Sequence, residues 1–170
     1  MDAYSTHQRL LLRAALNTTG PILELGCGWY STLILHEVAR RQDRLLISED
    51  NDPAWLERVR AKFVTPEHIF RPLSRAGWRE WWGLVFVDHG PPPELPRNSK
   101  GLLNALDRGQ AVLDLMGNAD VFVLHDTQPD VRWEYDWDKV LPLFKHQVTD
   151  EIVGVQTTVL SNSVDVTKWT

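Results

Sequence analysis

Acid and histidine side chains follow two strongly apolar segments of this sequence. Asp88 and His89 follow Leu84–Val87, and Asp126 comes two residues after Val121–Leu124. Continuous apolar runs of this kind are typical of central parallel strands that are covered on both faces. Since the carboxyl ends of parallel strands meet at one edge of a sheet, the three polar side chains would share a rim. Such a cluster can move protons or bind a metal ion, unless it only caps the loops.

His89 is the side chain of this rim that titrates nearest neutrality, because an unperturbed imidazole has a pKa of about 6.5. We therefore name Asp88, His89 and Asp126 as candidate catalytic residues, with His89 as the favoured proton acceptor. The following segment, Pro129–Trp137, has neither strand nor helix periodicity. It is expected to form a flap over the rim, with a purely structural loop as the alternative.

A second chemical feature is the stretch Pro21–Ala39, which begins as a short apolar strand over Ile22–Leu25. The turn Gly26-Cys27-Gly28 follows, and Ser31 or Thr32 can start a helix, because a hydroxyl there accepts a hydrogen bond from an unpaired amide of the first turn. This arrangement aims backbone N–H groups and the positive end of a helix dipole at one point. A nucleotide or an amino-acid carboxylate commonly binds there.

The details of the turn argue against the two commonest nucleotide loops. Ser31 stands where a dinucleotide fingerprint would require its third glycine, and no Gly-Lys-Ser/Thr follows to form a P-loop. Glu24 lies just before the turn, where its carboxylate would repel a pyrophosphate but suit a cationic ligand. Cys27 is interpreted as a small residue that fits the turn, with a nucleophilic role as the alternative.

An acidic cluster follows the next apolar strand, which is predicted over Arg44–Glu49. Asp52-Pro53 begins a helix, since proline suits the first helical position and an acid there favours the helix dipole. Asp50 stands about 20 residues after the glycine turn, where a carboxylate is positioned to bind ribose hydroxyls. Glu49 is the neighbour that could take this role instead.

Together these segments resemble the class I S-adenosylmethionine-dependent methyltransferases. The family's first motif is E/D-x-G-x-G, and Glu24–Thr32 looks especially like its branch E-L-G-x-G-x-x-S-T. Asp50–Leu56 is similar to the family's acid-x-D-P-x-x-L segment, and Leu84–His89 is similar to its fourth motif. The resemblance implies a Rossmann-like, doubly wound α/β fold in a single domain over residues 1–170. Its seven-stranded sheet would be mostly parallel, with an antiparallel C-terminal hairpin.

The resemblance implies S-adenosylmethionine as the cofactor, bound at the ends of the first, second and fourth strands. A weaker likeness is to the catechol-type O-methyltransferases, in which acids after the fourth and fifth strands hold a magnesium ion. Those relatives follow the second acid with Asn, whereas this sequence has Thr127, so a divalent metal is not favoured and no metal ligand is assigned. The residues implied to contact the cofactor are Glu24, Gly26, Cys27, Gly28, Ser31, Thr32, Glu49, Asp50, Leu73, Ser74 and Asp88.

The implied activity is methylation of a small-molecule acceptor, at oxygen. A net charge of −5 disfavours a nucleic-acid partner, and no apolar run is long enough to cross a bilayer. The single cysteine fits a reducing cytoplasm, and eight tryptophans are compatible with the surface of a homo-oligomer. The alternative is a non-catalytic or regulatory protein that binds S-adenosylmethionine or S-adenosylhomocysteine. An NAD-dependent oxidoreductase is disfavoured by Ser31 and by the lack of a recognisable hydride-transfer site.

Further elements are expected around this framework. Tyr4–Leu16 forms an amphipathic pattern whose His7 is either a substrate-side residue or a solvated first-turn histidine. Gly101–Met116 is predicted to be a long helix. Two β-branched runs, Gln156–Ser161 and Val164–Val166, are separated by an Asn-Ser turn and predict the C-terminal hairpin.

The third strand is predicted over Glu67–Leu73, and a loop or short helix over Ser74–Gly83 follows it. That segment carries Trp78, Trp81 and Trp82. One of these rings could stack on an adenine, or all of them could pack beneath the sheet.

Overall fold

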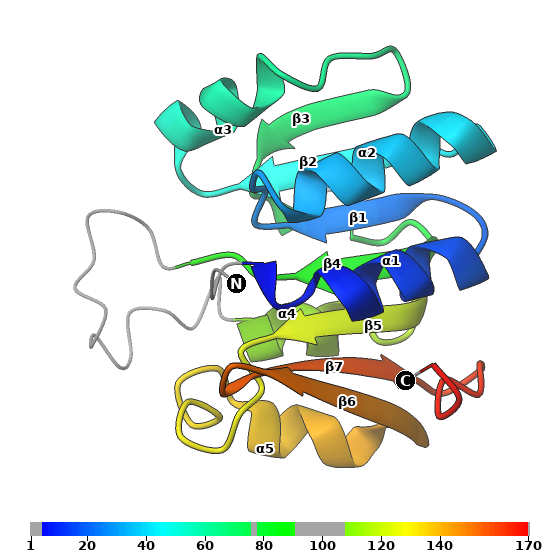
Figure 1. The fold of residues 1–170 in the computed structure, drawn as a ribbon, viewed down its shortest axis with the longest axis vertical. Helices are drawn as coiled ribbons and strands as arrows, with labels where there is room; N and C mark the ends of the chain where they lie inside the picture. Colours follow the sequence, from blue (N-terminus) through cyan, green and yellow to red (C-terminus); the bar gives the residue numbers. More distant parts are fainter. Residues whose placement is uncertain (1–4, 76–77, 91–107, 170) are drawn as a thin grey trace.

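The structure, a computed structural model, describes residues 5–75, 78–90 and 108–169. Within them seven strands form one sheet in the order β3-β2-β1-β4-β5-β7-β6 (Figure 1). Strands β1 to β5 pair in parallel, whereas β7 runs antiparallel to both β5 and β6. This arrangement confirms the fold class predicted from the sequence. The strands are β1 (Ile22–Leu25), β2 (Leu46–Asp50), β3 (His68–Pro72), β4 (Trp82–Val87), β5 (Ala119–His125), β6 (His146–Ile152) and β7 (Val155–Ser161).

Helices cover both faces of this sheet (Figure 1). Helices α1 and α2 pack on one face, and α4 and α5 pack on the other. Among the described residues, no helix is both long and apolar enough to cross a membrane. The helices are α1 (Gln8–Asn17), α2 (Ser31–Gln42), α3 (Pro53–Arg60), α4 (Arg108–Leu115) and α5 (Trp137–Val140), and the 3-10 helix η3 (Leu141–Leu143) follows α5.

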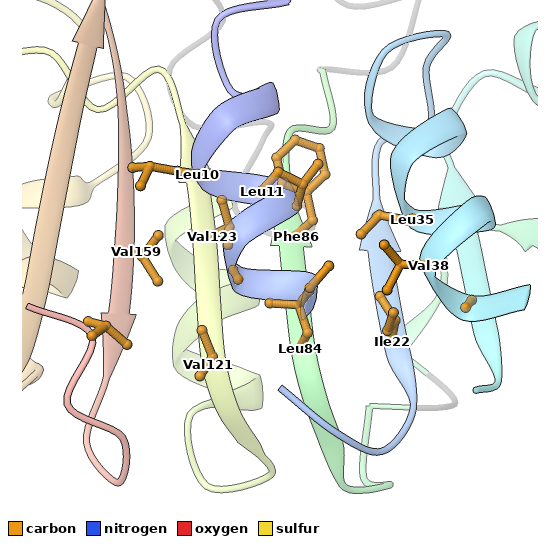
Figure 2. Close-up of a cluster of buried hydrophobic side chains, with 14 of the residues drawn as sticks. Leu10, Leu11, Ile22, Leu35, Val38, Leu84, Phe86, Val121, Val123 and Val159 are labelled. Carbon is orange, nitrogen blue, oxygen red and sulfur yellow. The ribbon is translucent and has the colours of Figure 1, made fainter. Parts of the chain in front are cut away.

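Alternate residues of the parallel strands build two separate cores. On the face covered by α1 and α2, Leu84 and Phe86 of β4 pack with Leu35 of α2 (Figure 2). Val85 belongs to the core on the opposite face, against α4 and α5. Every residue of β1 and β4 is buried. This agrees with their nearly continuous apolar sequences, which are typical of parallel strands covered on both faces. Glu24 is the one charged residue in β1.

The C-terminal hairpin is formed by β6 and β7, so the prediction that Val164–Val166 is its second strand is wrong. The chain reverses at Val153 and Gly154, both at positive φ (55° and 77°), as in the two-residue turns that match the twist of a hairpin. After β7 the Ser161 hydroxyl accepts hydrogen bonds from the amides two and three residues later. This local turn leads the chain out of the sheet, and the first and last residues of Val164–Val166 then pack on the core under α1.

Other boundaries differ less from the prediction. Strand β4 begins at Trp82, two residues earlier than expected, because the Trp82 ring is fully buried in the core that α4 and α5 cover. The predicted third strand is confirmed as β3. Of the predicted helix Gly101–Met116, residues 108–115 form α4, and residues 101–107 lie outside the described part of the chain.

The glycine turn gives a direct test of this packing. A Cβ added at Gly26 would meet the backbone of Asp88 and His89 far inside van der Waals contact, and Gly26 has a φ of +91°. Gly26→Ala should therefore lower the free energy of unfolding by at least the roughly 1–3 kcal/mol that overpacking costs, measured by urea unfolding. Gly117→Ala is the control, since its Cβ would meet nothing within 4 Å. Equal stability of both variants would contradict the close approach of β1 and β4.

Candidate active site

The carboxyl ends of four parallel strands bring the predicted site residues to one rim. The amide of Gly26, after β1, donates to the Glu49 carbonyl in β2 at 2.8 Å. The amide of Asp88, after β4, donates to the Leu25 carbonyl at 2.7 Å. Asp126 follows β5 beside β4. The parallel register thus joins segments that are about a hundred residues apart in the chain.

The glycine turn is fixed by hydrogen bonds at Cys27 and has free space at Gly28. The Asp50 carboxylate accepts a hydrogen bond from the Cys27 amide at 3.0 Å, and the Trp55 indole donates to the Cys27 carbonyl at 2.7 Å. A Cβ at Gly28 would meet only the Ser31 hydroxyl, at 3.8 Å. Gly28 therefore has room around its Cα, whereas Gly26 is packed against backbone.

The two candidate ribose acids, Glu49 and Asp50, differ in how many hydrogen bonds their carboxylates already accept from the protein. Glu49 is completely buried, and its carboxylate accepts hydrogen bonds from Arg71 Nε at 2.7 Å, the Ser74 amide at 3.1 Å and Trp78 Nε1 at 3.3 Å. Asp50 keeps 7% exposure, and each of its oxygens accepts one backbone amide. Burial raises the pKa of Asp50. Asp50 therefore has acceptor capacity left at the rim, which favours it over Glu49.

Glu24 lies beneath the glycine turn and is fully buried. The Thr32 hydroxyl donates to its carboxylate at 2.9 Å and accepts from the Gly28 amide at 2.9 Å. The Ser31 hydroxyl also bonds Glu24. The expectation that these hydroxyls cap the first turn of α2 is therefore wrong, because they face back toward β1.

The remaining predicted cofactor residues are placed as follows. Cys27 is buried, and burial together with the nearby Glu24 and Asp50 carboxylates raises the pKa of its thiol, so the thiol stays protonated and is not a nucleophile. Leu73 is partly buried, and its amide donates to the Asp50 carbonyl at 2.9 Å. Ser74 is exposed. These two residues thus adjoin the end of β2, where an adenine-covering segment was expected.

Two of the three tryptophans after β3 pack beneath the sheet. Trp78 and Trp82 are both buried in the core that α4 and α5 cover. Trp81 is 49% exposed, and its indole donates to Asp120 at the amino end of β5, opposite the rim. The packing interpretation therefore holds for Trp78 and Trp82, and Trp81 lies at the end of the sheet opposite the rim.

At the second half of the rim, Arg108 bridges the two predicted catalytic acids. Its guanidinium lies 3.0 Å from an Asp88 carboxylate oxygen and 3.1 Å from an Asp126 carboxylate oxygen. Its Nε donates to the His89 carbonyl at 2.8 Å, and its Cζ lies 4.2 Å from the centre of the Tyr135 ring. A buried cation therefore joins the two predicted catalytic acids.

His125 extends this network. Its Nδ1 lies 3.1 Å from Asp88, and its Nε2 lies 2.9 Å from the Thr6 hydroxyl. Burial alone would lower the pKa of His125, but the Asp88 and Asp126 carboxylates together outweigh it and the pKa is raised. Burial alone would raise the pKa of Asp88, but His125 and Arg108 lower it to about 2. Asp88 is thus held as a carboxylate.

His7 lies beside this pair, so the solvated interpretation of this residue is wrong. Its ring is 3% exposed, 4.8 Å from the His125 ring and 5.0 Å from the Phe86 ring. Neither nitrogen of His7 has a hydrogen-bond partner within the described residues, and burial lowers its pKa to about 4. Ligand atoms of His7, Asp88 and His125 lie within 4.8 Å of one another, a donor set that suits transition metals. Because the Arg108 guanidinium already pairs with Asp88, it would repel a metal ion bound at this position.

The side chains of His89 and Thr127 at the rim are buried. His89 is 2% exposed, and the Thr127 hydroxyl is fully buried at 2.7 Å from Thr158 Oγ1. Asp88 and Asp126 keep side-chain exposures of 24% and 26%. The two acids, rather than His89, are therefore the accessible catalytic candidates.

Sequence reasoning assigned no role to Arg108, Thr6 or His125. Arg108 carries a signal that could have been used, because the apolar stripe of α4 continues from it at Ala111 and Val112. An arginine on the buried stripe of a helix needs acid partners. Thr6 offered no comparable signal.

The Arg108 bridge gives a second prediction. Arg108→Met should lower the free energy of unfolding at pH 7 by about 3–5 kcal/mol, because it leaves buried carboxylates uncompensated. In the wild type, the folded-state pKa of Asp88, about 2, lies below its ordinary value of 3.8. Its stabilisation is therefore present above about pH 4 and lost as the pH falls toward 2, and this loss should shrink in the variant.

Urea unfolding at several pH values measures both effects. Arg60→Met is the control, because the Arg60–Glu57 pair is at the surface, with side-chain exposures of 53% and 65%. If the Arg108→Met variant were as stable as this control, the Arg108 bridge would contribute nothing to the free energy of unfolding.

No protein-family model and no curated protein matches this sequence. Solved structures match over most of their length. A candidate caffeoyl-CoA O-methyltransferase from Staphylococcus aureus is 10% identical, with a TM-score of 0.60 over 90% of this chain and 80% of its own. Human methyltransferase-like protein 13 in complex with SAH is 16% identical, with a TM-score of 0.59 over 95% and 79%. An RNA methyltransferase from Salinibacter ruber in complex with S-adenosyl-L-homocysteine is 15% identical, with a TM-score of 0.51 over 92% and 90%. These likenesses show that the chain has the Rossmann-like fold of these methyltransferases.

Proposed function

We propose that this protein is an S-adenosylmethionine-dependent methyltransferase that methylates an oxygen atom of a small molecule. The observation that carries the proposal is the meeting of two features at one sheet edge. The glycine turn opens over Gly28 beside the Asp50 carboxylate, and the acid pair Asp88 and Asp126 lies at the ends of the next two strands. The fold is that of methyltransferases, two of which hold S-adenosylhomocysteine in their structures.

The chemistry of the site suits this cofactor. Glu24, Asp50, Asp88 and Asp126 supply four carboxyl groups around the turn and the rim, which favour a sulfonium cation over the pyrophosphate of a dinucleotide. Asp50 would hold the ribose hydroxyls, and the turn would hold the methionine part. When bound, S-adenosylmethionine supplies an electrophilic methyl group on sulfur.

The protein's own residues would align the acceptor and remove its proton. Asp88 is fixed by Arg108 and His125, so it orients the acceptor rather than taking up the proton. We assign proton acceptance to Asp126, and keep His89 as the alternative base. Asp126 has a φ of 57°, and its carbonyl accepts from the Trp137 indole at 2.9 Å. Strained backbone that neighbours hold in place is typical of functional positions.

Electrostatics favour a small acceptor over RNA. The net charge is −5, and at the rim the Asp88 and Asp126 carboxylates are partly exposed, whereas Arg108 and His125 beside them are buried. A polyanion would meet repulsion at this edge, whereas a neutral hydroxyl compound would not. The neighbours by fold include both kinds of enzyme, so the acceptor class depends on this charge argument.

The third prediction concerns the cofactor. S-adenosylhomocysteine should bind and raise the melting temperature, while NAD should not, since a ligand of the folded state stabilises it by mass action. Asp50→Asn should weaken this binding by about 1.5–3 kcal/mol, roughly 10–150-fold, through the loss of charge-assisted bonds to ribose. Calorimetry measures the affinity.

Glu49→Gln is the matched control, because the Glu49 carboxylate is already engaged by Arg71, Ser74 and Trp78. It should change stability more than affinity. If Glu49→Gln were the variant that lost binding, the ribose acid would be misassigned by one residue. Stabilisation by NAD alone would sink the cofactor assignment.

The fourth prediction concerns transfer itself. Methyl-labelled S-adenosylmethionine with a panel of phenols and alcohols should yield labelled ether, and a chelator should leave the rate unchanged because Arg108 supplies the bridging cation. Asp126→Asn should lower kcat by about 10²–10⁴-fold, as the loss of a general base does. Asp130→Asn, an exposed acid on the same loop, is the control.

Each other outcome has a distinct meaning. Label found only in RNA would overturn the acceptor class. Binding of the cofactor without transfer to any acceptor would support the regulatory alternative. Loss of activity with the chelator would show that the rim uses a metal ion.

A further inference from the structure

A continuous chain of hydrogen bonds leads from beneath the glycine turn to the protein surface. The Ser48 hydroxyl donates to the Glu24 carboxylate and lies 2.8 Å from His68 Nε2. His68 Nδ1 lies 3.0 Å from His36 Nδ1. Glu24, Ser48 and His68 are all buried, whereas His36 on α2 is partly exposed. We call these four side chains the Glu24 relay.

The geometry fits two opposite hydrogen-bond polarities. With Glu24 ionised, His36 Nδ1–H donates to His68, His68 Nε2–H donates to Ser48, and Ser48 donates to the carboxylate. With Glu24 protonated, every bond reverses and the His68 Nδ1–H donates to His36. Converting one state into the other moves one proton between Glu24 and solvent, and each side chain passes on one hydrogen.

The surroundings of Glu24 bring its pKa near neutrality, so both protonation states are accessible. Burial raises its pKa to about 7, against the opposing effect of the Ser48, Ser31 and Thr32 hydroxyls. Burial and, to a smaller extent, the neighbouring His36 lower the pKa of His68 to about 3, so His68 is neutral in both states. The other charged or titratable groups facing the relay are Asp50 and Cys27 at the turn, and Glu37 and Arg40 beside His36.

The relay is coupled to the turn through one hydroxyl. Thr32 Oγ1 donates to Glu24 and accepts from the Gly28 amide, in the turn where the proposed cofactor would bind. A positive charge bound above the turn stabilises ionised Glu24 through the low-dielectric core of the sheet. A neutral ligand of the same shape does not.

We propose that the Glu24 relay makes binding of the cationic S-adenosylmethionine release a proton to solvent through His36, whereas the neutral S-adenosylhomocysteine leaves that proton on Glu24. The inference rests on the proposed function. Glu24 acts here as a positioning residue that distinguishes substrate from product by charge. In balance, protonated Glu24 loses H⁺ as the sulfonium arrives and regains it when the neutral thioether remains after transfer.

Calorimetry in phosphate and in Tris at pH 7, buffers of different ionisation enthalpy, measures the protons exchanged on binding each cofactor. In the wild type, S-adenosylmethionine should release up to about half a proton more than S-adenosylhomocysteine, since Glu24 is half protonated near its pKa of about 7. At pH 9, where Glu24 is already ionised, the difference should vanish. Glu24→Gln should abolish the difference at every pH.

Two further variants test the Ser48 hydrogen bond and the route through His36 separately. Ser48→Ala removes a hydrogen bond that favours the ionised form, so the largest difference should move to higher pH. His36→Phe should keep the stoichiometry but slow proton release, followed by stopped flow with an indicator dye, and His146→Phe on β6 is the control.

The outcomes separate the two proposals. Failure of both cofactors to bind would sink the proposed function. Equal proton release for both cofactors in the wild type, or a difference that survives Glu24→Gln, would overturn the relay while leaving the proposed function intact. Equal release rates in His36→Phe and the control would overturn the route through His36.

Discussion

The rim of this protein depends on the contact of one guanidinium with two carboxylates. Arg108 enters from α4 and meets Asp88 after β4 and Asp126 after β5, so it ties a helix to the carboxyl ends of two strands. Without the cation, two partly buried acids beside each other would repel, and one of them would take up a proton. With it, both can remain charged and accessible. The arrangement places two partly exposed carboxylates side by side at a sheet edge.

The sheet supplies the second constraint. In a parallel sheet with both faces covered, polar side chains are driven to the strand ends, because the interior of each strand faces a core on either side. Glu24 breaks this rule inside β1, and it is tolerated because Ser31, Thr32 and Ser48 satisfy its oxygens. The same hydrogen bonds fix the first turn of α2 under the glycine turn. The hydrogen bonds that satisfy the buried Glu24 carboxyl group therefore also determine the shape of the glycine turn.

Much of this could be predicted from the sequence because the signals are local. Apolar runs followed by acids located β4 and β5, the apolar run before the glycine turn located β1, and the Asp52-Pro53 pair located the start of α3. The C-terminal hairpin was misplaced because the Asn-Ser turn after β7 looked like a hairpin loop, while the real reversal at Val153 and Gly154 has no asparagine–glycine signature.

What could not be predicted is which distant side chains meet. The partners of Arg108 lie 18 and 20 residues away, and the Thr6 hydroxyl bonds a histidine 119 residues away. His68 looked like an ordinary strand residue, and only the register of β2 with β3 brings it to Ser48. Such contacts follow from sheet order, and periodicity along the chain carries no information about them.

The carboxyl groups of Asp88 and Glu24 show how environment divides roles between like residues. Asp88 faces a guanidinium and an imidazole, so its charge is fixed and its pKa falls to about 2. Glu24 faces only hydroxyls, so burial dominates and its pKa rises to about 7. Pairs of acids whose surroundings push their pKa values apart are a recurring basis for separate permanent and switchable charges. In the proposed reaction, the permanent charge of Asp88 would suit the orientation of the acceptor. The switchable charge of Glu24 would suit the cofactor side, where the proposed ligand changes from cation to neutral molecule.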